Sequence, residues 1–142
     1  MCFKLLYESN KKTEIPANFI PMAQIHDTGK QGEALAARFL EDAGCKILAT
    51  NWRYKQYELD IVAQEKDTLL IVEVKTRESN FFGEPESFVT KTKQKQLIKA
   101  AAAFVEQNNL DLEVRFDIVS VIIGKDKQQL NHIPGAFYPT LR

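Results

Sequence analysis

Cysteine and histidine are scarce in this chain of 142 residues, which contains two of each. Cys2 and Cys45 form no CxxC pair, and His26 and His132 stand alone, which argues against a zinc site and against a disulfide scaffold. Long apolar runs are also missing, because none approaches the roughly 18 residues that a membrane span requires. The first residues lack the apolar segment and the cleavage site of a signal peptide. We therefore expect a cytoplasmic protein without a membrane partner.

A net charge is missing too, since 19 Lys and Arg residues balance 19 Asp and Glu residues. A nucleic-acid partner would thus have to be recognised from local clusters of charge. The apolar fraction of 44% and the charged fraction of 27% are ordinary for a globular protein. Residues 1–25 contain two prolines and no periodic apolar spacing, so we expect an N-terminal extension, either flexible or weakly packed. Residues 26–142 are expected to form a single domain.

Apolar spacing predicts regular elements from residue 28 onward. A first helix is expected over 28–43, because Thr28 and Gln31 fit a capping box and Gly44 can end the helix. The remaining elements are a strand over 46–54, a hairpin within 58–75, a loop over 79–87, a helix over 90–108, a strand over 112–123 and a short strand near 130–133. The predicted order αβββαβ indicates an α/β fold.

The segment "ELDIVAQEKDTLLIVEVK", residues 58–75, places charged side chains within apolar strands. A turn at 66–67, or one at 65–68 with the same centre, puts Asp60 opposite Glu73 and Glu58 opposite Lys75. Opposite residues in an antiparallel pair share a face, with Cβ atoms roughly 4.5–5.5 Å apart. A divalent cation would relieve the repulsion between the first two carboxylates. The alternative is a solvated sheet face with an ordinary cross-strand ion pair.

Three further features favour a functional site over a solvated sheet face. Glu33 lies near the inward stripe of the first helix, although it also fits a helix-dipole partner. The segment "TKTKQKQLIK" gathers four lysines, Lys91, Lys93, Lys95 and Lys99, at the start of the long helix without an acid among them. The segment "NWRYK" interleaves aromatic and basic residues, a pattern compatible with nucleic-acid contact and also common in half-exposed strands.

The motifs together resemble a known family. "TGKQGEALAARFLEDAG", "NWRYKQYELDIVA", "LLIVEVKTR", "FFGEPESFVTKTKQKQLIKAA", "RFDIVSV" and "HIPGAF" are similar to the YraN family of small bacterial proteins, over about residues 28–137. That family resembles Holliday-junction resolvases of the restriction-endonuclease-like PD-(D/E)xK superfamily. The resemblance implies an α/β, restriction-endonuclease-like αβββαβ core with a mixed central sheet flanked by helices. Leu59 and Tyr57 depart from the usual pattern, which has proline and glycine at these positions.

The resemblance also implies site residues. The helix-one acid falls on Glu33, the metal-binding aspartate on Asp60, and the Glu-x-Lys signature on Glu73 and Lys75. A later polar or basic position falls on Gln94 or Lys95, and the sequence does not choose between them.

These residues predict an endonuclease that hydrolyses DNA phosphodiester bonds, in branched DNA if the resolvase likeness holds. Asp60 and Glu73 would hold Mg²⁺ or Mn²⁺, and Glu33 would bind the metal directly or through water. Lys75 would orient the attacking water. Arg77 and the lysines at 91, 93, 95 and 99, with Gln94, would contact nucleic acid. A homodimer is compatible with this prediction, and the alternative is a nuclease-like module that binds nucleic acid or protein without cutting.

Overall fold

The computed structural model describes residues 12–16, 27–78 and 89–139. The elements in these ranges are β1 (Lys12–Pro16), α1 (Thr28–Asp42), β2 (Lys46–Tyr54), β3 (Tyr57–Glu65), β4 (Thr68–Glu78), α2 (Lys91–Gln107), β5 (Glu113–Ile123) and β6 (Lys127–Phe137). From α1 to β5 this is the predicted order. The loop expected over 79–87 lies outside the described residues.

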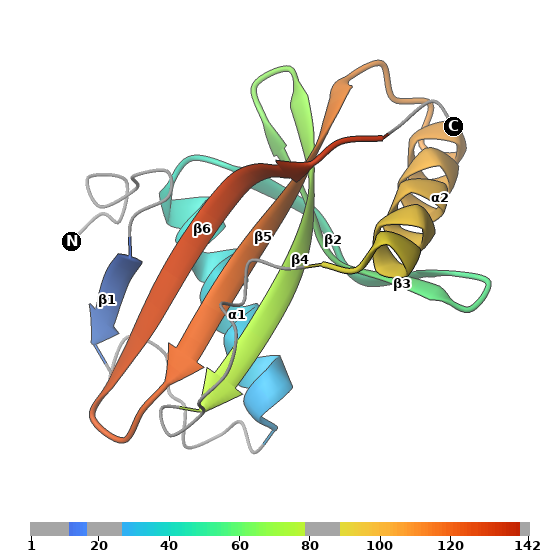
Figure 1. Cartoon of the computed structure of the whole chain (residues 1–142). Helices are drawn as coiled ribbons and strands as arrows, with labels where there is room; N and C mark the ends of the chain where they lie inside the picture. The colour runs from blue at the N-terminus through green and yellow to red at the C-terminus, as the bar shows by residue number, and fades with distance from the viewer. Residues whose placement is uncertain (1–11, 17–26, 79–88, 140–142) are drawn as a thin grey trace.

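The strands form one mixed sheet in the order β1-β6-β5-β4-β3-β2. β4 and β5 run parallel, and the other neighbouring pairs are antiparallel. The parallel pair arises because α2 carries the chain from β4 across the sheet to β5 (Figure 1). An α/β fold with a mixed sheet and two helices is therefore confirmed for the described residues.

The two helices cover opposite faces of the sheet. On β4, Leu70 and Val72 pack with the buried residues of α1, while Leu69 and Ile71 pack with those of α2. All four side chains are buried, as expected for a strand covered on both faces. β4 therefore lies inside the sheet and contributes side chains to the apolar cores on both of its faces.

Both helices begin directly after a residue whose side chain caps the first turn. The N-cap of α1 is Asp27, whose carboxylate accepts the N–H of Lys30 at 3.1 Å, so the prediction of a capping box beginning at Thr28 was wrong by one residue. Gly44 has a φ of 99° after the helix end, as the predicted left-handed stop requires. Thr90 caps α2 by accepting the N–H of Lys93 at 3.2 Å, close to the predicted start.

Two strands differ from expectation. β1 was not predicted, and it pairs antiparallel with β6 at the edge of the sheet. The rest of residues 1–25 lies outside the described part of the chain, so the division into extension and domain stays a prediction. β6 is longer than the short strand expected near 130–133, because it continues through Pro134 and Gly135 to Phe137. Within the described ranges, no helix is long and apolar enough to cross a membrane.

Candidate metal and nucleic-acid site

The candidate site lies where β3 and β4 separate. Their ladder runs from Glu65↔Thr68 to Ile61↔Val72, so the chain turns at Lys66 and Asp67, as predicted. Beyond Ile61, β3 stays paired with β2 as far as Tyr57, whereas β4 stays paired with β5 as far as Glu78. The sheet therefore forks at this point. The β2–β3 hairpin extends past α2, whereas the C-terminal part of β4 extends in the opposite direction (Figure 1).

Asp60 and Glu73 are the first residues past the last rung of this ladder. The Asp60 carboxylate accepts the backbone N–H of Val74 at 2.9 Å and so replaces the next ladder bond. The continued register would put Asp60 opposite Glu73, as the sequence predicted. The ladder does not reach Glu58 and Lys75, so the predicted cross-strand pairing of these two residues was wrong.

The two carboxylates are mostly buried, and burial disfavours the ionisation of both. Burial raises the pKa of Glu73 to about 7, and the charge of Asp60 adds to this rise. Burial likewise raises the pKa of Asp60 to about 6, against the lowering effect of the Val74 hydrogen bond, and Glu33 and Glu58 raise it further. Such a pair of acids is expected where a cation or a proton is to be held.

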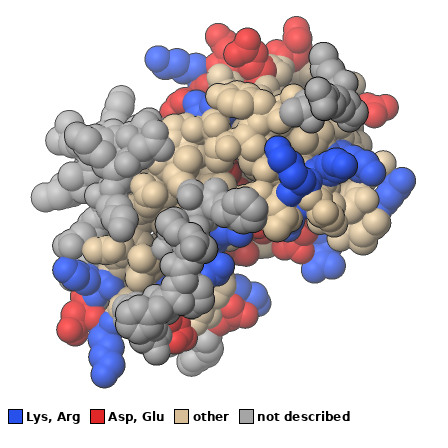
Figure 2. Space-filling view, viewed as in Figure 1, with Lys and Arg blue, Asp and Glu red and all other residues tan. Residues whose placement is uncertain are grey.

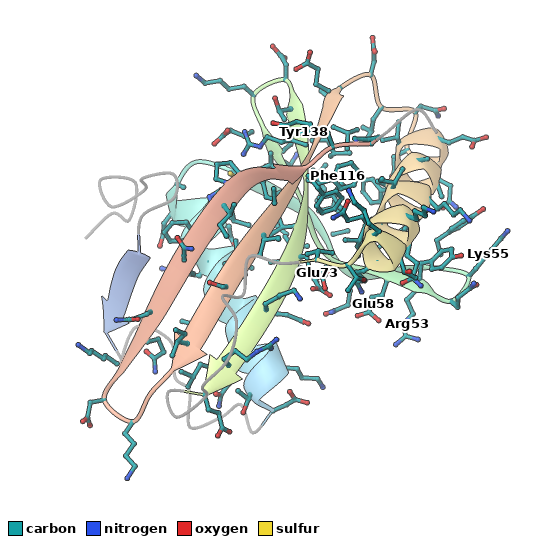
Figure 3. All side chains as sticks on the ribbon, viewed as in Figure 1. Arg53, Lys55, Glu58, Glu73, Phe116 and Tyr138 are labelled. Carbon is teal, nitrogen blue, oxygen red and sulfur yellow. The ribbon has the colours of Figure 1, made fainter. Side chains whose placement is uncertain are left out.

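Among the described residues, one of the two Glu73 carboxylate oxygens has a partner and the other has none. Its Oε1 lies 3.6 Å from Nζ of Lys93 at the start of α2. Its Oε2 is buried and has no hydrogen-bond partner among the described residues. A buried carboxylate oxygen without a partner carries a desolvation cost that a bound cation would remove. Figure 3 shows Glu73 and Glu58 near the N-terminal end of α2.

Glu33 reaches the fork from α1 and is held by an asparagine. Nδ2 of Asn51 on β2 donates to Glu33 Oε2 at 2.9 Å and to Glu58 Oε1 at 3.1 Å. Glu58 also pairs with Arg53 across the hairpin at 3.2 Å. Sequence reasoning missed Asn51, whose φ of 48° is a left-handed conformation that asparagine tolerates better than most residues.

A surface pocket of about 330 Å³ adjoins this bridge. Its lining combines the start of α1 with the β2–β3 hairpin, namely Asp27, Gly29, Lys30, Glu33, Asn51, Arg53 and Glu58. The described residues contain no group of three or more His, Cys, Asp or Glu side chains placed to hold a metal ion. Mg²⁺ is commonly held by one or two carboxylates together with waters and substrate phosphates, and Asp60 and Glu73 are the pair that could supply them here.

The predicted basic residues fall into different environments. Lys75 shares the Glu73 face of β4 and lowers the pKa of Glu73. Arg77 donates to the carbonyl of Thr76 at 2.8 Å. Of the α2 candidates, Gln94 donates to the carbonyl of Val89 at 2.9 Å and Lys95 is exposed, so the side chain that meets Glu73 is Lys93.

The lysines of α2 other than Lys93 point to solvent. Lys91, Lys95 and Lys99 are exposed and lie four residues apart, on one ridge of the helix. Figure 2 shows basic side chains gathered on this side of the molecule. The local clustering of positive charge expected from the sequence is therefore present beside the fork, in a chain of zero net charge.

A second polar cluster lies in the core, apart from the fork. Asp117 is fully buried and accepts two hydrogen bonds from Arg115, each at 2.8 Å, and one from the N–H of Gly135 at 3.0 Å. His132 Nε2 lies 2.8 Å from the same carboxylate. Burial raises the pKa of Asp117, but the hydrogen bonds from Arg115, His132 and Gly135 outweigh burial and hold this pKa below its usual value. The sequence signal was the alternation Arg-x-Asp within "RFDIV", which puts both side chains on one face.

Comparison with known proteins finds a matching family and similar relatives. Residues 32–121 match the profile of the uncharacterised protein family UPF0102. The chain is 46% identical over 117 residues to a UPF0102 protein of Flavobacterium psychrophilum, covering 82% of this chain and 98% of the relative. It is 43% identical over 121 residues to one of Parabacteroides distasonis, covering 85% and 100%. It is 44% identical over 110 residues to one of Geobacter metallireducens, covering 77% and 90%. The profile match includes every site residue from Glu33 to Lys99.

Proposed function

We propose that this chain, which belongs to the UPF0102 (YraN) family, is a metal-dependent endonuclease that hydrolyses phosphodiester bonds in DNA. The observation that carries the proposal is the pair of mostly buried acids at the fork of the sheet, one of which has a buried oxygen without a hydrogen-bond partner among the described residues. The likeness of the sequence motifs to resolvases of the restriction-endonuclease-like superfamily supports the same chemistry and favours branched DNA as the substrate.

Asp60 and Glu73 would hold Mg²⁺ or Mn²⁺ between β3 and β4. Asn51 donates to one of the two carboxylate oxygens of Glu33 at 2.9 Å and so ties this side chain to β2. A water-mediated contact of Glu33 with the metal therefore fits better than a direct one. The bound ion would supply a Lewis acid for the phosphate and would lower the pKa of a coordinated water.

The residues of the chain would position the water and the phosphate. In the hydrolysis, the water oxygen bonds to phosphorus while one phosphorus–oxygen ester bond breaks, which leaves a phosphate monoester and an alcohol. Lys75, on the face of Glu73, would orient this water, favour the loss of its proton through its positive charge and stabilise the charge that develops on phosphorus, and the proton would end on the alcohol that leaves. Once a bound cation neutralises the charge of Glu73, Lys93 would release Glu73 and bind the substrate phosphate. Arg77 and the exposed lysines of α2 would hold flanking phosphates, which gives affinity without sequence preference.

A second candidate function is a nuclease-like module that binds nucleic acid or a protein without cutting. The observation that favours it is the ion pair between Lys93 and Glu73 at 3.6 Å, because an internal cation already offsets part of the acidic charge. This candidate requires no saturable metal site. The two candidates therefore differ in a property that can be measured without knowing the natural substrate.

The test is a cleavage assay on end-labelled linear, flapped and four-way DNA, with Mn²⁺ or Mg²⁺ and with chelator. We expect metal-dependent cleavage by the wild type, strongest on a branched substrate, and none by Asp60→Asn or Glu73→Gln. Glu41→Gln, a change of an exposed acid on α1, is the matched control and should cut normally. Binding of all three substrates without cleavage under any metal condition would favour the non-cutting module instead.

A further inference from the structure

A second hollow lies on the other side of the β2–β3 hairpin, between its turn and α2. Its volume is about 480 Å³. We call it the hairpin groove, and its lining residues are Tyr54, Lys55, Gln56, Tyr57, Lys99, Ala102, Ala103 and Glu106. None of these residues belongs to the acidic site at the fork, so the hairpin groove needs an explanation of its own.

Small side chains on the helix and rings on the hairpin shape the groove. Ala102 and Ala103 leave space that larger side chains would fill. On the hairpin, Tyr54 stacks on Trp52 with ring centroids 6.3 Å apart, and Trp52 meets Phe104 of α2 edge to face at 5.1 Å. This chain of ring contacts joins the hairpin to the helix, and Tyr54 and Tyr57 give the groove an aromatic wall.

Tyr57 is the ring best placed to receive a ligand. Tyr54 already has Trp52 beside it and Nζ of Lys55 5.3 Å from its ring centroid. Among the described residues, no aromatic ring and no cation is stacked on Tyr57, which is half-buried against the α2 side of the core. Aromatic rings in such a position stack well with the faces of nucleobases.

The charges around the groove suit a nucleic-acid strand. Lys55 and Lys99 stand on its two walls, and Glu106 is the one acid among the described residues that line it. Lys91 and Lys95 extend the positive charge along the same ridge of α2, which from residue 91 to residue 99 spans about 12 Å at the helical rise. Figure 3 places Lys55 at the far end of the hairpin from Glu73.

The groove also lies within reach of the acidic site. Tyr57 precedes Asp60 by three residues on β3, a path of about 10 Å at the rise of a strand. Stacked bases follow one another at about 3.4 Å, so this path corresponds to about three nucleotide steps. Because Tyr57 and Asp60 are an odd number of positions apart, their side chains point to opposite faces of β3, so a DNA strand that contacts both would pass around the edge strand β2.

We propose that the hairpin groove binds unpaired nucleotides of DNA, with a base stacked on Tyr57 and a neighbouring phosphate on Lys99. Its role beside a scissile phosphate rests on the proposed nuclease function, but the binding itself does not. A paired base has neighbours on both faces and cannot enter the groove without leaving its stack, so the groove would distinguish single-stranded from duplex DNA. No sequence preference is expected, because every base has a face that can stack.

The test measures binding in chelator, without cleavage, by fluorescence anisotropy of labelled single-stranded and blunt duplex DNA of equal length. Tyr57→Leu removes the ring, Tyr57→Phe keeps it, and Ala102→Phe fills the groove from an exposed helix position. We expect Tyr57→Leu and Ala102→Phe to weaken single-strand binding by roughly 5- to 150-fold, the range for one stacked base, and Tyr57→Phe to bind like the wild type. Duplex binding should change less than twofold in all three variants. Melting temperatures report whether each variant is folded.

A 2-aminopurine base in the single strand gives a second readout. Its fluorescence should fall when the wild type or Tyr57→Phe binds, because the base stacks on a ring, and should not fall with Tyr57→Leu. Unchanged single-strand affinity in both Tyr57→Leu and Ala102→Phe would overturn the groove proposal. That result is distinguishable from failure of the proposed function, because metal-dependent cleavage in the assay above could still occur. Conversely, base stacking on Tyr57 without any cleavage would support the groove and count against the nuclease.

Discussion

Asp60 accepts the backbone N–H of Val74 at 2.9 Å, at the point where the ladder between β3 and β4 ends. The carboxylate takes the place of a main-chain acceptor, so the backbone of the neighbouring strand fixes its position. This bond opposes the effect of burial on the pKa of Asp60. The same acid thus helps to hold the fork together and contributes charge to the candidate metal site.

The first prediction separates these two roles of Asp60. Without metal, Asp60→Asn should raise the free energy of unfolding, because the amide oxygen can still accept the Val74 N–H while the repulsion from Glu73 is lost. Asp60→Ala should lower it by about 1–3 kcal/mol, because the N–H is left without that acceptor. Urea denaturation in chelator measures both. Equal effects of the two substitutions would show that the Val74 bond does not matter.

The second prediction concerns Lys93, which shares Glu73 with any bound cation. Lys93→Gln should strengthen Mn²⁺ binding by a few-fold, since it removes a partly exposed competing charge 3.6 Å from the carboxylate. The same variant should lose cleavage rate if Lys93 holds the substrate phosphate. Calorimetric Mn²⁺ titration measures the affinity, and Lys95→Gln, an exposed neighbour, is the control. Weaker metal binding in Lys93→Gln would argue that Lys93 supports the site in another way.

The third prediction concerns the ridge of α2. Replacing Lys91, Lys95 and Lys99 together by Gln should weaken DNA binding and flatten its salt dependence, since each phosphate contact contributes about 0.9 to the log–log slope. Replacing the exposed Lys46, Lys66 and Lys125 removes the same charge elsewhere and serves as the matched control. Similar slopes for the two triple variants would place the DNA away from α2.

The fourth prediction uses the buried carboxylate of Asp117. Its pKa is lower in the folded chain than the ordinary value of about 3.9, so its contribution to stability is present above that value and disappears as the pH falls through the lowered pKa. Asp117→Asn should lower the free energy of unfolding at pH 7 by about 3–5 kcal/mol, the cost of breaking a buried ion pair. The difference from the wild type should shrink below about pH 4.

Denaturant unfolding at several pH values measures that difference. Asp111→Asn, at an exposed position just before β5, controls for the loss of one negative charge. A difference between wild type and Asp117→Asn that stays constant from neutral to acid pH would show that the charge of Asp117 does not stabilise the fold.

Local sequence patterns were enough to predict the hairpin and the neighbouring positions of Asp60 and Glu73. The turn at Lys66 and Asp67 separates two apolar strands, and strand alternation then determines which residues share a face. The fork itself was not predictable, because it depends on how far β4 continues with β5, a pairing between segments far apart in the chain. For this reason the expected partnership of Glu58 with Lys75 failed and Glu58 pairs with Arg53.

Contacts between elements also explain the residues that sequence reasoning missed. Asn51 bridges Glu33 and Glu58 only because α1 and the β2–β3 hairpin meet at the fork. Lys93 was expected to contact nucleic acid, and its proximity to Glu73 comes from the placement of α2 over the sheet. β1 was not predicted because its pairing with β6 joins segments at opposite ends of the chain. Magnesium dependence, DNA binding, a homodimer and a cytoplasmic location stay predictions.

The central claim is that Asp60 and Glu73 hold a divalent cation, and thermal unfolding with and without metal tests it most directly. A ligand that binds only the folded state at a hundredfold excess over Kd stabilises it by about 2.7 kcal/mol. Mg²⁺ or Mn²⁺ should therefore raise the melting temperature of the wild type by several degrees in a saturable manner. Asp60→Asn should show no such response, although it melts higher than the wild type in chelator. An equal metal-induced shift in the wild type and in Asp60→Asn, or no shift in either, would contradict the proposed site.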